Sequence, residues 1–200
     1  MLSSQYHMSP LTEQSNRLKK LADDLLASSK LPEILAKYGD IIFVGSYAAG
    51  LMMHGDIDIH ILREKPFTKQ ETLDIFNDLV ALTKFNSYYI GDWNDTNLHP
   101  EFPYGYYIGL KTQPTDIKWK IDLWFLSTAE QSKFDQKKLD ITKIALSDDQ
   151  REAILSFKKY RQQNALKISG QEIYKLVLED GVTTLDEFKK RTSDLSKIQL

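Results

Sequence analysis

The chain has 200 residues, of which 42% are hydrophobic and 11% aromatic, a composition typical of globular proteins and not of disordered ones. Its formal charge is −2 with both signs mixed along the chain, which argues against a stable nucleic-acid partner. It has no cysteine, no apolar run long enough to cross a bilayer and no signal-like start, so we expect no cysteine-bound metal, no membrane partner and a cytoplasmic location.

The first forty residues favour helices. Apolar residues recur at helical spacing from residue 12 to about residue 28, which predicts an amphipathic helix. A shorter helix follows, with Pro32 suited to its first turn and Gly39 to its end. The chain is therefore expected to begin with a helical lead-in.

A buried strand is predicted at residues 41–44, and it runs directly into Gly45-Ser46. Glycine lets the backbone approach a phosphate closely. Free N–H groups at the start of a helical turn, together with a serine hydroxyl, form an anion site. These two residues are therefore candidates for binding phosphate.

The next predicted strand carries two like charges. Isoleucines alternate with Asp56, Asp58 and His60, so the two aspartates project from one face. Two close carboxylates repel each other unless they share a proton or bind a divalent cation such as Mg²⁺. Short Asp-x-Asp runs also occur in turns and on solvent-facing strands. His60 shares the face of Asp58 and would either contact substrate or be a hydrogen-bonded core histidine.

A mixed α/β region follows. Thr68 and Glu71 have the spacing of a capping box, which predicts a helix beginning there. Runs rich in aromatic and β-branched residues predict three further strands, at residues 86–91, 104–111 and 118–126.

Asp122 lies among apolar residues of the last of these strands, where a lone charge is costly to bury. It is therefore either a carboxylate that faces a metal ion or one paired with Lys118 or Lys120 on an exposed face. Arg63, Lys65, Lys118 and Lys120 are themselves candidates for phosphate contacts or solvated surface residues.

The segment DWNDTNLHPEFP, between two of the strands, is long enough to be a functional loop. It could form a cleft for a small polar or cationic acceptor, or it could be a solvated loop with a few anchoring aromatics. In the first interpretation the charges and walls of the cleft come from Asp92, Asp95, Glu101, Trp93, Phe102 and Tyr104.

The last third of the chain is predicted to be helical, with capping residues at Ser147, Ser169 and Thr184. The helix containing Lys158 could close over a nucleotide, with Tyr160 stacking on a base, but packing explains the apolar spacing equally well. We therefore divide the chain into a catalytic region with N-terminal helices, residues 1–145, and a helical region, residues 146–200.

Taken together, Val44-Gly45-Ser46, a gap of nine residues, Asp56-Ile57-Asp58-Ile59 and the later Asp122 resemble the nucleotidyltransferase superfamily typified by DNA polymerase beta. The resemblance covers roughly residues 40 to 126. It implies an α/β (α+β) nucleotidyltransferase fold, with a mixed sheet flanked by helices and a helical C-terminal region. It also implies that Asp56, Asp58 and Asp122 are catalytic and bind two Mg²⁺ ions, while Gly45 and Ser46 hold the phosphates of a nucleoside triphosphate.

The activity implied by the resemblance is transfer of a nucleoside monophosphate from a triphosphate such as ATP to an acceptor hydroxyl, with release of pyrophosphate. The weakly acidic charge disfavours a polynucleotide acceptor, so a small molecule is expected. The main alternative is a non-catalytic nucleotide-binding module of regulatory or toxin–antitoxin type. A metal-dependent phosphohydrolase is a third possibility, which the Gly-Ser phosphate site makes less attractive.

Overall fold

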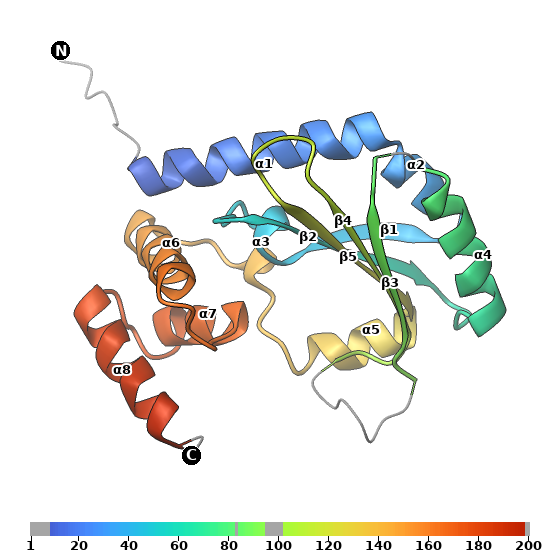
Figure 1. The fold of residues 1–200 in the computed structure, drawn as a ribbon. Helices are drawn as coiled ribbons and strands as arrows, with labels where there is room; N and C mark the ends of the chain where they lie inside the picture. Colours follow the sequence, from blue (N-terminus) through green and yellow to red (C-terminus); the bar gives the residue numbers. More distant parts are fainter. Residues whose placement is uncertain (1–8, 83, 95–101, 199–200) are drawn as a thin grey trace, which may run out of the picture.

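A five-stranded mixed sheet forms the centre of the computed structural model, which describes residues 9–82, 84–94 and 102–198 (Figure 1). The strand order is β1-β2-β5-β4-β3, in which β2 and β5 run parallel and the other neighbours pair antiparallel. The strands are β1 (Asp40–Val44), β2 (Gly55–Arg63), β3 (Ser87–Asp92), β4 (Tyr106–Thr112) and β5 (Trp119–Ser127). The predicted mixed sheet and its helical flanks are confirmed.

Helices cover the sheet on both sides and extend beyond it (Figure 1). The helical elements are α1 (Pro10–Ser29), α2 (Leu31–Leu35), α3 (Gly45–Ala48), α4 (Lys69–Val80), α5 (Thr128–Asp135), the 3₁₀ turn η1 (Ile141–Lys143), α6 (Asp148–Gln163), α7 (Gly170–Leu178) and α8 (Leu185–Ile198). α1, α2 and α4 cover one face of the sheet, α5 packs against part of the other face, and α6, α7 and α8 gather to one side. In the described part of the chain, no helix is both long and apolar enough to span a membrane.

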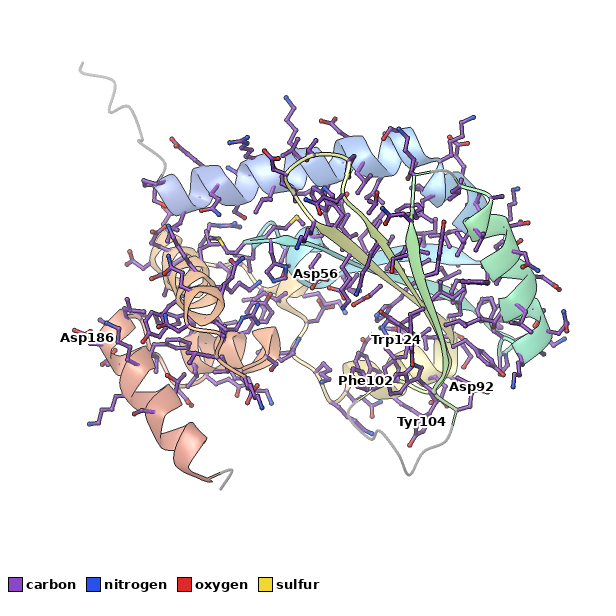
Figure 2. The ribbon with its side chains drawn as sticks, in the orientation of Figure 1. Asp56, Asp92, Phe102, Tyr104, Trp124 and Asp186 are labelled. Carbon is purple, nitrogen blue, oxygen red and sulfur yellow. The ribbon has the colours of Figure 1, made fainter. Side chains whose placement is uncertain are left out.

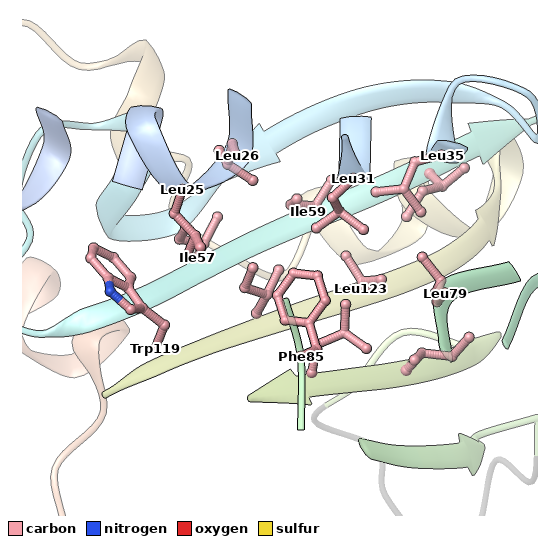
Figure 3. Packing of buried hydrophobic residues seen from close by; sticks show 14 of the residues in the cluster. Leu25, Leu26, Leu31, Leu35, Ile57, Ile59, Leu79, Phe85, Trp119 and Leu123 are labelled. Carbon is pink, nitrogen blue, oxygen red and sulfur yellow. The ribbon is translucent and has the colours of Figure 1, made fainter. Parts of the chain in front are cut away.

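One face of the sheet is entirely apolar where it meets α1, α2 and α4 (Figure 3). Ile57 and Ile59 of β2 lie beside Ile121 and Leu123 of β5 in parallel register, and all four are fully buried. Burying one such side chain contributes about 1.5–3 kcal/mol to stability. Because side chains alternate along a strand, the same packing fixes which residues point to the opposite face.

The C-terminal helices have a core of their own. Phe157 of α6 stacks on Phe188 of α8 with ring centroids 4.3 Å apart, and Tyr160 meets the Phe188 ring edge-on at 6.2 Å. The position of Tyr160 is thus explained by packing, as one of the two sequence interpretations had it. The capping boxes at Ser147 and Ser169 are confirmed. The boundary between residues 145 and 146 lies in the coil before α6 and stays a prediction.

Two helical elements were not expected from the sequence, α5 and η1. α5 has the sequence TAEQSKFD, in which apolar residues do not recur at helical spacing, and none of its residues is fully buried. It begins at a side-chain cap, in which the Ser127 hydroxyl accepts a hydrogen bond from the Glu130 N–H. This cap stops β5 and turns the chain back over the open face of the sheet.

Candidate active site

Gly45, the first residue of α3, directly follows β1 and brings the backbone against the carboxylate of Asp58. Its φ is +65°, in the left-handed region that favours glycine, and a Cβ at this position would stand 2.6 Å from Asp58 Oδ2. The neighbouring one-turn helix α3 carries Ser46 and follows β1 directly. The turn and the aspartate strand are therefore adjacent, because Val44 pairs with Asp58 between β1 and β2.

Three aspartates share the face of the sheet opposite the apolar core. Asp58 of β2 stands directly beside Asp122 of β5 in the parallel register, and Asp56 lies two residues before Asp58. Neighbouring strands are about 4.8 Å apart, so these carboxylates form one patch. The sequence interpretation that places Asp56 and Asp58 on one face is confirmed.

Burial and repulsion disfavour the charged forms of Asp56 and Asp58. Burial, followed by the negative charges of Asp56 and Asp122, raises the pKa of Asp58 to about 7. Burial also raises the pKa of Asp56. A patch of this kind has a high affinity for positive charge.

Asp122 already has two partners. Its Oδ1 accepts a hydrogen bond from the Tyr107 hydroxyl at 2.5 Å, and its Oδ2 accepts one from the Lys120 ammonium at 2.5 Å. Lys120 Nζ also lies 4.0 Å from Asp56 Oδ1. Asp122 is therefore paired with Lys120, as one of the two sequence alternatives had it. That alternative placed the pair on an exposed face, whereas the Asp122 side chain is only 11% exposed.

The aspartate patch fits a hard divalent cation by its chemistry. Carboxylate oxygens are the ligands that Mg²⁺ prefers. Asp56 Oδ1 is buried without a hydrogen-bond partner among the described residues, a state that costs free energy unless a cation supplies the missing contact. Across the described ranges, no three acidic or histidine side chains already lie in a ligating arrangement. Asp122 is instead engaged by Tyr107 and Lys120.

Lys158 of α6 lies behind the Gly-Ser turn and is 3% exposed. Its ammonium donates to Ser46 Oγ at 2.6 Å, to the Leu51 carbonyl at 3.0 Å and to the Tyr174 hydroxyl at 2.9 Å. Burial, and then the nearby charge of Arg161, lowers the pKa of Lys158 to about 7. A buried cation thus connects the helical region to the candidate phosphate site.

A cavity of about 930 Å³ opens along this face of the sheet. One end contains Gly45, Asp58 and Asp122, and the other is lined by aromatic rings. Figure 2 shows Trp124 and Phe102 together near α5, while Asp56 lies farther along the sheet toward α3. The aromatic end of the cavity is formed by Tyr89, Trp93, Phe102, Tyr107, Trp124 and Phe134.

No model of a known protein family matches the sequence, and no curated protein matches it either. Solved structures do. A structure of the Cid1 poly(U) polymerase with Mg and 3′-dATP bound has 12% sequence identity and a TM-score of 0.56, over 86% of this chain and 55% of that one. A structure of Cid1 described by its RNA terminal uridylyl transferase activity has 15% identity and a TM-score of 0.53, over 83% and 47%. The fold is that of a nucleotidyltransferase.

This chain spans about half the length of the Cid1 structures that it matches. At such low identity the likeness establishes the nucleotidyltransferase fold, and the chemistry has to be argued from the residues of the site. In this chain those residues stand on three neighbouring elements: the Gly-Ser turn after β1, the adjacent strand β2 with two aspartates and the parallel strand β5 with a third.

The structure describes part of the 92–103 loop, from which the sequence predicted an acceptor cleft. Trp93 and Phe102 line the cavity with ring centroids 5.0 Å apart, and Phe102 stacks on Trp124 at 5.7 Å. Asp92 accepts hydrogen bonds from Asn94. Tyr104 lies near the ends of β3 and β4 (Figure 2). Asp95 and Glu101 lie outside the described residues.

Two of the basic residues proposed from the sequence, Arg63 and Lys120, lie in different surroundings. Arg63 pairs with Glu71 at 2.8 Å and lies over the Phe67 ring, so it belongs to the start of α4 and not to the cavity. Lys120 lines the cavity and contacts Asp122. Lys158 was not proposed as a site residue, although its position four residues after Ile154, on the apolar stripe of a helix, was a usable signal.

His60 is the hydrogen-bonded core histidine that one sequence interpretation described. It is buried, and its Nδ1 lies 2.6 Å from Gln131 Oε1 of α5. Burial lowers its pKa, so the neutral ring is favoured. Because Gln131 Oε1 can only accept, Nδ1 carries the proton, and the contact fastens α5 to β2.

Proposed function

We propose that the chain is a metal-dependent nucleotidyltransferase that moves a nucleoside monophosphate from a nucleoside triphosphate to a hydroxyl group of a small-molecule acceptor. The observation that carries the proposal is the set of Gly45, Asp58 and Asp122 on one wall of one cavity. The nucleotidyltransferase fold supports it. A single site then holds the donor, the acceptor and the groups that act on both.

The triphosphate would lie against the Gly45-Ser46 turn. Gly45 lacks the side chain that would meet Asp58 Oδ2, so the turn lies close to that aspartate, and the Ser46 hydroxyl accepts a hydrogen bond from Lys158 Nζ at 2.6 Å. A bound triphosphate would favour the charged form of Lys158, whose pKa burial has lowered to about 7. Lys158 would therefore contribute most when the donor is present.

Asp56, Asp58 and Asp122 would hold Mg²⁺, as two ions, which when bound would neutralise the phosphates and stabilise the attacking and leaving oxygens. The acceptor oxygen forms a bond to the α-phosphorus, and the bond from that phosphorus to the oxygen bridging the β-phosphate breaks. Pyrophosphate leaves with the electron pair of that bond. We assign the acceptor proton to Asp122, which contacts Tyr107 of the aromatic end of the cavity.

The aromatic end of the cavity supports a small acceptor. A cavity of about 930 Å³ is of the size that holds small ligands, and stacked rings supply a surface for a planar or apolar group. The net charge of −2 offers little compensation for the phosphates of a polynucleotide. A compact acceptor therefore fits this site better than RNA does.

The test supplies each of the four nucleoside triphosphates, labelled at the α-phosphate, with Mg²⁺ and three acceptors: a panel of aromatic alcohols and sugars, an oligoribonucleotide and the protein itself. We expect label on a small hydroxyl compound, and none with Asp56→Asn/Asp58→Asn. Asp24→Asn, at an exposed position of α1, is the matched control and should behave as wild type.

Label on the oligoribonucleotide alone would overturn the small-molecule acceptor and keep the transferase. Failure of every acceptor, combined with a Mg²⁺-dependent rise in melting temperature on adding one triphosphate, would favour the non-catalytic nucleotide-binding module. The engagement of Asp122 by Lys120 and Tyr107 is the observation that keeps this second function in view.

A further inference from the structure

Lys120 occupies the centre of the aspartate patch. It is the register partner of Asp56 across β2 and β5 and shares a face with Asp122, two residues along its own strand. Its ammonium lies 2.5 Å from Asp122 Oδ2 and 4.0 Å from Asp56 Oδ1. It thus approaches two of the three carboxylates at once.

This arrangement differs from an ordinary surface ion pair, which contributes little to stability. The Asp122 side chain is 11% exposed, and Asp56 Oδ1 has no hydrogen-bond partner among the described residues. Lys120 itself is 48% exposed, so only its ammonium end enters the patch. The Lys120 ammonium therefore compensates carboxylates that stand on two strands of the sheet.

The second oxygen of Asp122, Oδ1, is held by Tyr107 on the neighbouring strand β4. Gly109 of β4 faces Asp122 in the antiparallel register, and a Cβ there would stand 2.6 Å from the Tyr107 hydroxyl. The missing side chain leaves the space through which Tyr107 reaches Asp122 Oδ1. Both oxygens of Asp122 thus accept a hydrogen bond in the metal-free state, Oδ1 from Tyr107 and Oδ2 from Lys120.

We propose that Lys120 is an internal counter-ion that takes the place of the divalent cation in the metal-free protein and lowers the affinity of the site for free metal ions. This inference rests on the metal-binding role of the aspartates in the proposed function. Lys120 has room to withdraw, because it also lines a second cavity of about 320 Å³ together with Tyr88, Gly109 and Lys111. Metal binding would then exchange one cation for another without refolding the patch.

The exchange makes the site selective for its donor. A free divalent ion must displace the ammonium by itself, whereas an ion that arrives with a triphosphate brings anionic groups that the displaced Lys120 can contact. The site would therefore load with the metal–nucleotide complex in preference to the metal alone.

The test measures Mn²⁺ binding to the full chain without nucleotide, using the electron paramagnetic resonance signal of free Mn²⁺. Lys120→Gln should bind Mn²⁺ about tenfold more tightly than wild type, because a charge in direct contact with the ligands is removed. Lys20→Gln is the matched control. It removes the same charge from an exposed position of α1, which covers the opposite face of the sheet, and should change the affinity by no more than about twofold.

A second measurement compares stability with and without metal. Without metal, Lys120→Gln should melt at a lower temperature than Lys20→Gln, since the carboxylates lose their counter-ion, and saturating Mn²⁺ should remove the difference. Adding Asp58→Asn to wild type and to Lys120→Gln should remove the tight Mn²⁺ binding from both.

Equal Mn²⁺ affinities of Lys120→Gln and Lys20→Gln would overturn the counter-ion role while leaving the metal site intact. Weaker binding by Lys120→Gln than by wild type would overturn it as well. If neither wild type nor Lys120→Gln binds Mn²⁺, or if binding survives Asp58→Asn, the metal site itself fails and the proposed function fails with it.

Discussion

The two faces of the sheet differ more than any other two regions of the molecule. On β5, Ile121 and Leu123 point into a core closed by α1, α2 and α4, whereas Asp122, between them, points into the cavity. On β2 the isoleucines and aspartates alternate in the same way. Adjacent residues on one strand thus serve opposite purposes, one face supplying stability and the other holding charges that disfavour folding.

The contrast explains how the chain tolerates its site. Burial and repulsion raise the pKa of Asp58 to about 7, which means that the ionised patch is a liability in the folded state. The apolar face offsets it with side chains that are fully buried. Substitutions on the cavity face should therefore reduce activity more than stability, and substitutions on the core face should do the reverse.

The largest expected effect is that of Asp122→Asn. It removes one of the three carboxylates, and we expect turnover of the labelled triphosphate to fall on the order of a thousandfold. The stability cost should not exceed about 1–2 kcal/mol, because the amide oxygen can still accept from Lys120 and the amide NH2 can donate to the Tyr107 hydroxyl, while the repulsion falls. Turnover and urea unfolding of the same preparation test this pair of values. A fully active Asp122→Asn would remove Asp122 from the mechanism.

Next comes the neighbouring residue on the other face. Ile121→Ala leaves a void in the core and should cost about 2–5 kcal/mol in the free energy of unfolding. Activity per folded molecule should stay near that of wild type at a temperature where the variant is folded. Urea unfolding with an activity assay on the folded fraction measures both. Loss of activity without loss of stability would show that the two faces are coupled, contrary to the comparison.

The pH dependence of the free energy of unfolding tests the cost of burying a charged group in α6. Lys158 has its pKa lowered to about 7 in the folded state, so between about pH 7 and the usual lysine range the unfolded chain binds more protons. Stability should therefore rise with pH over this window. Relative to Lys158→Met, wild type should gain about 1–2 kcal/mol between pH 7.5 and 9.5.

Urea unfolding of both proteins across this range gives the difference, in which the contributions of groups remote from Lys158 cancel, and carrying both through the Asp56→Asn/Asp58→Asn background removes those of the two aspartates that Lys158 influences. Lys159→Met, on the exposed side of the same helix, is the control and should run parallel to wild type. A pH-independent difference between wild type and Lys158→Met would mean that Lys158 keeps its ordinary pKa.

Much of the fold and the carboxylate patch could be predicted because alternation along a strand is visible in a sequence. The isoleucines around Asp56 and Asp58 place both aspartates on one face, and the apolar residues around Asp122 do the same for β5. The capping boxes at Ser147 and Ser169 were equally visible, since each is a local pattern.

What the sequence did not reveal depends on contacts between distant segments. α5 has no apolar periodicity, so its cap at Ser127 was the sole local sign of it. Lys158 meets Ser46 across 112 positions of chain, and a lysine on an otherwise apolar stripe is ordinarily read as solvated. The sequence offered the contact between Lys120 and Asp122 as an alternative to a metal site. In the structure, Lys120 contacts the same carboxylate that is the candidate metal ligand.

The smallest expected effect is that of removing a single tyrosine hydroxyl, which can be compared between the two faces of the sheet. Tyr107→Phe removes the hydrogen bond to Asp122, and Tyr88→Phe removes the one from Tyr88 to the Phe85 carbonyl at 2.7 Å, beside the core. Each should cost about 1 kcal/mol in the free energy of unfolding. Saturating Mg²⁺ should reduce the cost of Tyr107→Phe, because the Asp122 oxygen that it frees can bind the cation, and should leave the cost of Tyr88→Phe unchanged. Urea unfolding with and without Mg²⁺ measures the four values. An equal response of both variants to Mg²⁺ would place the ion away from Asp122 and would remove the chemical difference between the two faces.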